Sequence, residues 1–398
     1  MRLNTWYEAG LAAGMVLLSG CGGETLEPLP SKFEAVVAGG IHSCGIVTDG
    51  QAFCWGNNLY GQVGDGSTKS HVYPVPVVGS IRYEMIIAGV GHTCGIATTG
   101  AAYCWGFNLN GQLGDGTHTD RGTPASVDGG FMWVSLSIGG SYTCGIATDS
   151  LGYCWGLNNA GQVGDGTTND RPSPTAVSGE RKFQSISAHA YHTCALTFAG
   201  EVYCWGSNDY GQLGTGNSDD SNTPLVVGGG LTWAAVSAGF SHTCGITPEG
   251  NGYCWGRNHF GQLGVGDSVG GQDQTLPFPM AGGIVWASID LGAYFSCGIE
   301  AQTAAAYCWG YNGSGQLGAE APDRCTVDPS VYQCAFVPFG VSGGHTFAAV
   351  SANTQHTCAL SADGFAYCWG SGTDGQLGNG QKGSQIFSIE PVRVAGQP

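Results

Sequence analysis

The chain has 398 residues, of which 71 are glycine and only 10% are charged. This composition favours a turn-rich, β-dominated fold and argues against helical bundles and coiled coils, whose wet faces need Lys, Glu and Ala. The net charge of −17 argues against nucleic-acid binding, because phosphates are bound by clustered Lys and Arg.

The first twenty residues have the layout of a secretory leader, with Arg2 followed by a short apolar run that ends at Leu18. Leu-Ser-Gly directly before Cys21 resembles the lipobox of bacterial lipoproteins. The resemblance implies cleavage before Cys21, transfer of a diacylglyceryl group to its sulfur and acylation of the new amine. We expect a signal peptide at 1–20, a tether at 21–31 and a folded region at 32–398. An ordinary signal peptide is the alternative.

Acyl chains such as palmitate on Cys21 would hold the protein on a membrane through its N-terminus alone. The expected location is the bacterial cell envelope, on the periplasmic side or the cell surface. Gly22, in the place where Asp would retain a lipoprotein in the inner membrane, favours the outer membrane by analogy with Gram-negative sorting.

The remaining sixteen cysteines reveal an internal repeat. Fourteen form seven pairs, and the first five pairs recur at a period of 50 residues: Cys44 with Cys54, Cys94 with Cys104, Cys144 with Cys154, Cys194 with Cys204, Cys244 with Cys254, Cys297 with Cys308, and Cys358 with Cys368. Nine or ten residues separate the two members, which predicts a hairpin with a disulfide directly across it. Zinc is the alternative, but it needs four ligands and closely spaced pairs. Cys325 and Cys334 lie in an insertion of the sixth unit and are expected to close that loop.

Each unit contains four candidate strands: an alternating apolar run, a His-Thr-Cys-Gly-Ile run, a Tyr-Cys-Trp-Gly run, and a run that follows a proline such as Pro224. Seven four-stranded units predict an all-β fold, a seven-bladed β-propeller of antiparallel blades with one disulfide in each. The expected units are about 33–80, 81–130, 131–180, 181–230, 231–283, 284–344 and 345–398.

The run Trp-Gly-x-Asn-x-x-Gly-Gln-Leu-Gly after each hairpin resembles the regulator of chromosome condensation repeat, over about residues 33–396. The best-known role of that family is nucleotide exchange on a nuclear small GTPase with docking on chromatin. That role conflicts with the leader, the acidic charge and the disulfides of this chain.

Residues repeated in the units are interpreted as scaffold. A histidine two positions before the first cysteine is replaced by Tyr142 and Phe295 in two units, so a packing role is favoured over a metal ring. The glutamine present in all seven units is interpreted as a hydrogen-bonding strut, and Asp65, Asp115 and Asp165 as turn residues. The sequence contains no triad motif, phosphate loop or zinc-protease motif. We therefore expect no catalysis, no metal and no cofactor.

Side chains that vary between the units are the candidates for function. The first-to-second and third-to-fourth connections of each blade emerge on one face, which we call the loop face. The candidate partner-binding residues there are Tyr60, Phe107, Tyr191, Tyr210, Phe240, Arg257, His259, Phe260, Tyr294, Tyr311 and Asp374. Exposed rings and Arg are enriched at binding hot spots. The alternative is that several rings point into neighbouring blades.

These observations favour a monomeric, lipid-anchored binding or scaffold module for an unidentified protein partner. One alternative is an inhibitor of a hydrolase, since the chain is similar to a secreted β-lactamase inhibitor protein built on the same repeat. A second alternative is a carbohydrate-binding or carbohydrate-active protein, because rings also stack on sugars. That activity would need paired carboxylates near the axis.

Overall fold

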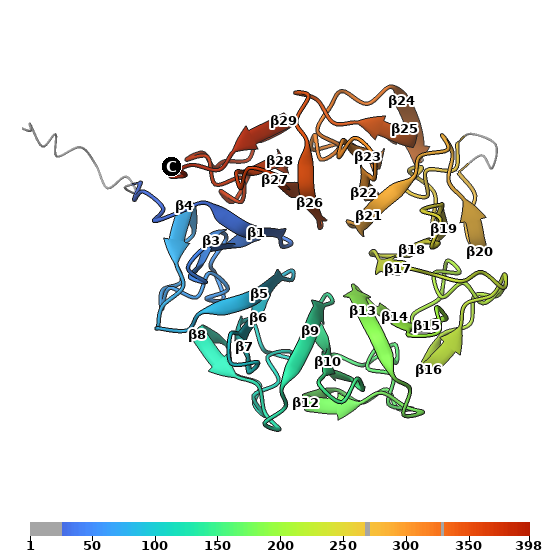
Figure 1. Ribbon diagram of the computed structural model, residues 1–398, viewed down its shortest axis with the longest axis horizontal. Coiled ribbons are helices and arrows are strands. Elements are labelled where there is room, and N and C mark those ends of the chain that lie inside the picture. The colour runs from blue at the N-terminus through green and yellow to red at the C-terminus, as the bar shows by residue number, and fades with distance from the viewer. Residues whose placement is uncertain (1–25, 267–270, 328–329) are drawn as a thin grey trace, which may run out of the picture.

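The computed structural model describes residues 26–266, 271–327 and 330–398. Within these residues the chain forms seven antiparallel sheets that stand around a central axis as a ring (Figure 1). The predicted seven-bladed β-propeller is confirmed. Across the same residues, no helix combines the length and apolarity needed to cross a bilayer.

Each sheet is a blade made of consecutive strands, and the first strand of each blade lies nearest the axis (Figure 1). The first four blades are β1 (Phe33–Ala38), β2 (His42–Val47), β3 (Ala52–Gly56), β4 (His71–Pro76); β5 (Tyr83–Ala88), β6 (His92–Ala97), β7 (Ala102–Gly106), β8 (Arg121–Ser126); β9 (Trp133–Ile138), β10 (Tyr142–Ala147), β11 (Gly152–Gly156), β12 (Arg171–Ala176); and β13 (Phe183–His189), β14 (His192–Thr197), β15 (Val202–Gly206), β16 (Ser221–Val226). The last three are β17 (Ala235–Ala238), β18 (His242–Ile246), β19 (Gly252–Gly256), β20 (Gln274–Pro279); β21 (Trp286–Leu291), β22 (Phe295–Glu300), β23 (Ala306–Tyr311), β24 (Asp323–Val327), β25 (Ser330–Gly340); and β26 (Phe347–Ala352), β27 (His356–Ser361), β28 (Ala366–Ser371), β29 (Phe387–Arg393).

The fourth strand of a blade begins earlier than predicted, because it includes the proline instead of following it. In β16, Pro224 lies inside the strand, at a shift of register between the pairs Cys204↔Leu225 and Gly206↔Ser221. A proline is tolerated at such an irregularity in an edge strand, since its missing N–H breaks no ladder hydrogen bond.

The predicted cysteine pairs close the hairpins, and each of the seven disulfides is confirmed. In the first blade Cys44 lies directly opposite Cys54, with their Cα atoms 4.0 Å apart. The other six pairs have the same geometry at 4.0–4.1 Å: Cys94 with Cys104, Cys144 with Cys154, Cys194 with Cys204, Cys244 with Cys254, Cys297 with Cys308, and Cys358 with Cys368.

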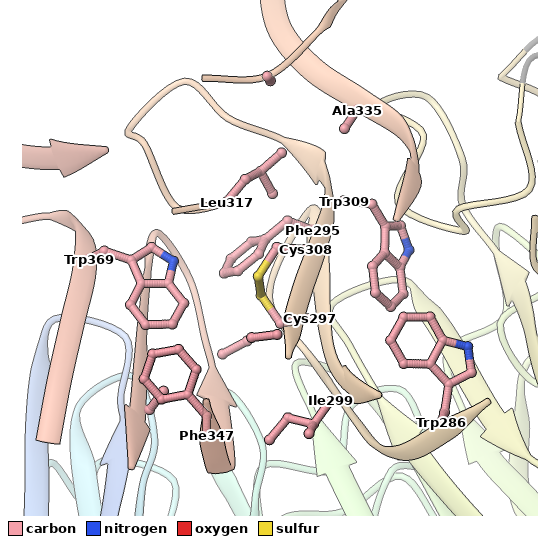
Figure 2. Close-up of a cluster of buried hydrophobic side chains, with 14 of the residues drawn as sticks. Trp286, Phe295, Cys297, Ile299, Cys308, Trp309, Leu317, Ala335, Phe347 and Trp369 are labelled. Carbon is pink, nitrogen blue, oxygen red and sulfur yellow. A yellow bond between two sulfur atoms is a disulfide. The ribbon is translucent and has the colours of Figure 1, made fainter. Parts of the chain in front are cut away.

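The eighth disulfide joins Cys325 to Cys334 between β24 and β25, in the insertion of the sixth blade, and so closes that loop as predicted. Figure 2 shows Cys297 and Cys308 enclosed by Trp and Phe rings of the core. The hairpin disulfide of this blade is therefore shielded from solvent.

One joint is repeated at all seven contacts between blades. Trp105 Nε1 donates to the Gln62 carbonyl oxygen of the preceding blade (2.9 Å), and Thr93 Oγ1 donates to the same oxygen (2.8 Å). Gly64 lies against that Trp with a φ of +79°, and a Cβ there would stand 2.6 Å from Trp105 Nε1. The equivalent tryptophans, Trp55, Trp155, Trp205, Trp255, Trp309 and Trp369, make the same bond.

The joint between the last and first blades closes the ring. Trp55 Nε1 donates to the Gln376 carbonyl oxygen at 2.9 Å, as at the other joints. Upstream of β1, the Leu29 N–H bonds to the Gly396 oxygen at 2.8 Å, and the Leu29 side chain is only 5% exposed, in one core cluster with Val394. Contact with the propeller therefore begins before residue 32.

Candidate functional site

The repeated histidines lie in the joints between blades. His42 Nε2 is 2.7 Å from Thr93 Oγ1 of the next blade. Because that hydroxyl donates its hydrogen to the Gln62 carbonyl oxygen, the imidazole is the donor. Burial lowers the pKa of His42 to about 3, so the ring is neutral. The packing role is therefore combined with a hydrogen bond, which His92, His192, His242 and His356 repeat.

The other repeated polar residues also hold the scaffold. In every unit the glutamine Oε1 accepts the N–H of the residue two positions before it, as Gln262 does from Phe260 at 2.9 Å. Asp115 accepts the Thr117 N–H (3.0 Å) and pairs with Arg121 (2.8 Å). No group of His, Cys, Asp and Glu within the described parts of the chain could hold a metal ion.

Unit-specific rings on blades four to six form one continuous surface, which we call the aromatic ridge. Its members are Tyr191, Tyr210, Phe240, Arg257, Phe260, Tyr294, Tyr311 and Tyr332. Successive ring centroids lie 5.1–6.1 Å apart, from Tyr191 through Phe240 and Tyr294 to Phe260 and Tyr311. These separations are those of favourable aromatic pairs, so the rings support one another across three blades.

A smaller group, the leucine patch, lies on the loops of blades one and two. It consists of Leu59, Tyr60, Val90, Phe107 and Leu109. The Tyr60 and Phe107 rings stand 4.7 Å apart, while Leu59 and Leu109 are 65% and 66% exposed. Apolar side chains this exposed, gathered on one face, are typical of interaction surfaces.

The two remaining candidates belong to neither group. His259 is exposed and lies 3.8 Å from Asp273. Asp374 accepts a hydrogen bond from Asn57 Nδ2 at 2.8 Å, which ties the seventh blade to the first. That bond indicates a structural role for Asp374.

A cavity of about 290 Å³ opens on the loop face at the mouth of the central channel. Val90 of the leucine patch lines it on one side, and Tyr191 and Phe240 of the aromatic ridge line it on the other. The cavity thus lies between the two groups of apolar side chains, and a partner that covered both would also cover the channel mouth.

A deeper cavity of about 140 Å³ on the axis is lined by Asp290. Asp290 Oδ2 accepts the Ala352 N–H of the next blade at 2.8 Å, and burial raises its pKa to about 6. Ser187 in β13 accepts the Ala238 N–H in the same way. Asp290 is the only carboxylate among the described residues that line the two axial cavities, so a glycosidase pair finds no support.

Three ridge and patch residues leave a buried donor without a partner. Where the residue after Trp-Gly is Asn57, Ser207 or Ser371, its oxygen accepts the Nε2–H of the unit's glutamine at 3.2–3.3 Å. At the equivalent position Phe107 and Arg257 have no acceptor atom, and the Tyr311 hydroxyl does not bond to the glutamine of its unit. In those units, Nε2 of Gln112, Gln262 and Gln316 is buried with no partner among the described residues. An unsatisfied buried donor costs about 1–3 kcal/mol.

The family model described as "Regulator of chromosome condensation (RCC1) repeat" matches residues 49–96, 99–146, 153–196, 199–246, 249–299 and 363–398. These segments cover well over half of the chain. The chain belongs to the regulator of chromosome condensation repeat family. A second model of the same repeat matches 33–62, 183–212, 233–262 and 347–376. The expected family membership is confirmed, and propellers of this family are typically protein-binding or scaffold modules.

Several solved structures share the fold of this chain. Human WBSCR16 is 18% identical, with a TM-score of 0.75 over 84% of this chain and 88% of its own. Yeast RCC1 (Prp20), in the crystal structure with Kap60, is 19% identical with a TM-score of 0.76, over 97% and 91%. The CRINKLY WD40 ectodomain of the Arabidopsis thaliana receptor kinase ACR4 is 20% identical with a TM-score of 0.53, over 86% and 96%. At these identities the likeness shows the fold alone.

Sequence reasoning missed three kinds of residue in this repeat protein. Tyr332 comes from the stapled hairpin β24–β25, which has no counterpart in other units and so could not be placed on a face. Leu59 and Leu109 occupy a variable loop position, and their exposure could have been inferred from that position. The unpaired Nε2 of Gln262 could have been inferred by comparing the residues after Trp-Gly between units.

Proposed function

We propose that this protein is a lipid-anchored, extracytoplasmic binding module that holds a protein partner on its loop face, through the aromatic ridge. In this proposal Cys21 carries the lipid anchor and the propeller is a rigid, non-catalytic platform. The location is the bacterial cell envelope, with the outer membrane favoured.

The observation that carries the proposal is the continuity of the aromatic ridge across three blades. Folding alone does not require these rings, because other units carry Gly, Ala, Ser or Asn at the equivalent positions. At Arg257 and Tyr311 the large side chain even leaves a buried glutamine donor unpaired. Local features that oppose stability are expected where a surface has a function.

The disulfides support the extracytoplasmic location. All sixteen cysteines that follow Cys21 form pairs, and seven of the eight pairs lie in the repeated hairpins of the blades. Disulfides persist in oxidising compartments and are rare in the cytosol. The secretory layout of residues 1–20 agrees with export.

Proximity labelling on intact cells tests partner binding. The variant with Tyr210→Ala and Phe260→Ala removes two rings of the ridge, and Phe198→Ala is the control. Phe198 is 66% exposed on the hairpin turn after β14, on the opposite face. We expect the native protein and the control to label the same partner, and the double variant to lose it while remaining folded. An equal labelling pattern for all three proteins would contradict the proposal.

Membrane fractionation tests the anchor separately. Replacing Cys21 with Ala removes the sulfur that would carry the diacylglyceryl group, so the protein should leave the membrane fraction and appear in the soluble fraction. A Cys21→Ala protein that stays with the membranes would show that the lipid is not the anchor.

A further inference from the structure

Among the described residues, no carboxylate forms an ion pair with Arg257. Its guanidinium carbon lies 4.5 Å from the Tyr210 ring centroid and 5.7 Å from that of Tyr294. Its Nε is buried and has no hydrogen-bond partner among the residues that the structure describes, and no ion pair of Arg257 occurs there. Its one polar side-chain contact runs from Nη2 to His259 Nδ1 at 3.5 Å.

Arg257 is distinguished by its place in the aromatic ridge, because Arg181, Arg324 and Arg393 also form no ion pair among the described residues. Acidic residues outnumber basic ones by 29 to 12, so carboxylates are plentiful. Elsewhere Arg121 pairs with Asp115 at 2.8 Å, and Arg82 lies 3.8 Å from Asp49. The guanidinium of Arg257 instead lies over the rings of Tyr210 and Tyr294, and none of its donors contacts a carboxylate of the described residues.

We infer that Arg257 receives a carboxylate of the protein partner, supplied by an acidic residue that stands beside an apolar one. This inference rests on the proposed function and names the chemistry of the partner. A guanidinium offers donors in a planar fork that matches a carboxylate, and stacking on rings pre-organises that fork. Because Nε is covered by the chain itself, the carboxylate would bind to the Nη donors of the fork.

The surroundings of Arg257 define the rest of the partner segment. From Arg257 the ridge continues through Tyr294 to Phe240, with ring centroids 5.7 Å apart, and Phe240 lines the channel-mouth cavity. The cavity wall is largely apolar, with Val90, Ile138 and Tyr191 among its residues. An apolar side chain fits such a wall, whereas the hydroxyls of an acidic sugar would need polar partners. A protein segment is therefore favoured over a uronic-acid glycan.

The test uses the oxidised protein with ¹⁵N-labelled arginine and follows the Nε–H signals by NMR. Three probes are titrated at constant ionic strength: phenylacetate, its neutral isostere phenylacetamide, and glucuronate. We expect phenylacetate to shift the Arg257 signal saturably, with a dissociation constant on the order of 10 mM. Phenylacetamide should bind at least about tenfold more weakly, because it lacks the charge that strengthens hydrogen bonds. The signals of Arg121 and Arg171, which already pair with Asp115 and Asp165, should not move.

Two controls locate the site. Arg257→Lys keeps the charge and loses the planar fork, so ring signals of Tyr210 and Tyr294 should respond to phenylacetate far less than in the native protein. Phe198→Ala, on the opposite face, should leave the titration unchanged.

Each contrary result overturns the inference. An Arg257 signal that does not respond, or that responds equally to phenylacetamide, shows that no carboxylate site exists. Tighter binding of glucuronate than of phenylacetate assigns the site to an acidic glycan. These titrations need no partner, so their failure is distinct from failure of the labelling experiment. The double variant Tyr210→Ala with Phe260→Ala could lose its labelled partner while the Arg257 signal of the native protein does not respond to phenylacetate. That combination would support the proposed function and reject only the inference of a carboxylate site.

Discussion

Replacing Arg257 with serine should stabilise the propeller while removing a binding residue. Ser207 and Ser371 occupy the equivalent loop position, and each accepts the Nε2–H of its glutamine at 3.3 Å. Arg257→Ser should restore that bond to Gln262, whereas Arg257→Ala should not. Both variants lose the stacking on Tyr210, worth about 0.5–1 kcal/mol at a half-exposed site. A satisfied donor in place of an unsatisfied one favours the serine variant over the alanine variant by about 1–2 kcal/mol.

Equilibrium unfolding in urea with the disulfides intact measures this difference, as the change in midpoint at constant m-value. Ser207→Ala is the reverse control, because it takes the acceptor away from Gln212 and should destabilise by a similar amount. Equal midpoints for the serine and alanine variants at position 257 would refute the reasoning. They would mean that the Gln262 donor is already satisfied in solution, and that Arg257 causes no loss of stability.

Three further changes test the scaffold. Burial raises the pKa of Asp290 from 3.8 to about 6, so folding favours its neutral form. The contribution of this carboxyl to the free energy of unfolding is therefore full below pH 3.8 and is lost as the pH rises through 6. Asp290→Asn should therefore stabilise by about 2–3 kcal/mol at pH 7 and by little below pH 3.8, and unfolding at the two pH values checks this. Burial lowers the pKa of His242 from 6.5 to about 3, so the free energy of unfolding falls as the pH drops below 6.5. His242→Tyr puts in this unit the residue that Tyr142 provides in another. It should reduce the slope of the unfolding free energy with pH by about 1.4 kcal/mol per pH unit. An unchanged slope would contradict the assigned burial. Removing one hairpin disulfide, by Cys244→Ala with Cys254→Ala, should cost about 2–3 kcal/mol in urea unfolding, as closure of an eleven-residue loop predicts.

Most of the fold could be predicted because its signals are local and repeated. The ten-residue step from Cys44 to Cys54 determines one hairpin, and its recurrence determines seven. The start of the fourth strand was wrong, because a proline such as Pro224 marks a boundary in central strands but is tolerated at an edge. The joint at which Trp55 meets Gln376 could not be derived, since closure depends on the summed angles of all blades.

The candidate site was predictable only as a set of residues, and their role in binding stays a prediction. Their position in variable loops placed Tyr210, Phe260 and Tyr294 on one face, but not in contact. The structure brings Phe260 to 5.4 Å from Tyr294 and adds Tyr332 from an insertion. Asp374 was also chosen for its variable loop position, but its carboxylate accepts a hydrogen bond from Asn57 of the first blade. A variable loop residue can therefore stabilise the contact between two blades instead of facing a partner.

The seam between the two chain ends has an evolutionary consequence. Every sheet is built from one uninterrupted stretch, and the seam at Trp55 and Gln376 uses the same bond as the six internal joints. Duplication or loss of the coding segment for one blade would therefore add or remove a complete sheet, and no strand would be left unpaired. The same property allows circular permutation. A chain in which a linker joins Pro398 to Leu26, and which is opened between any two blades, should fold to the same disc. With the lipid on Cys21 as proposed, permutation would move the membrane attachment around the circumference, and with it the angle at which the disc meets its target.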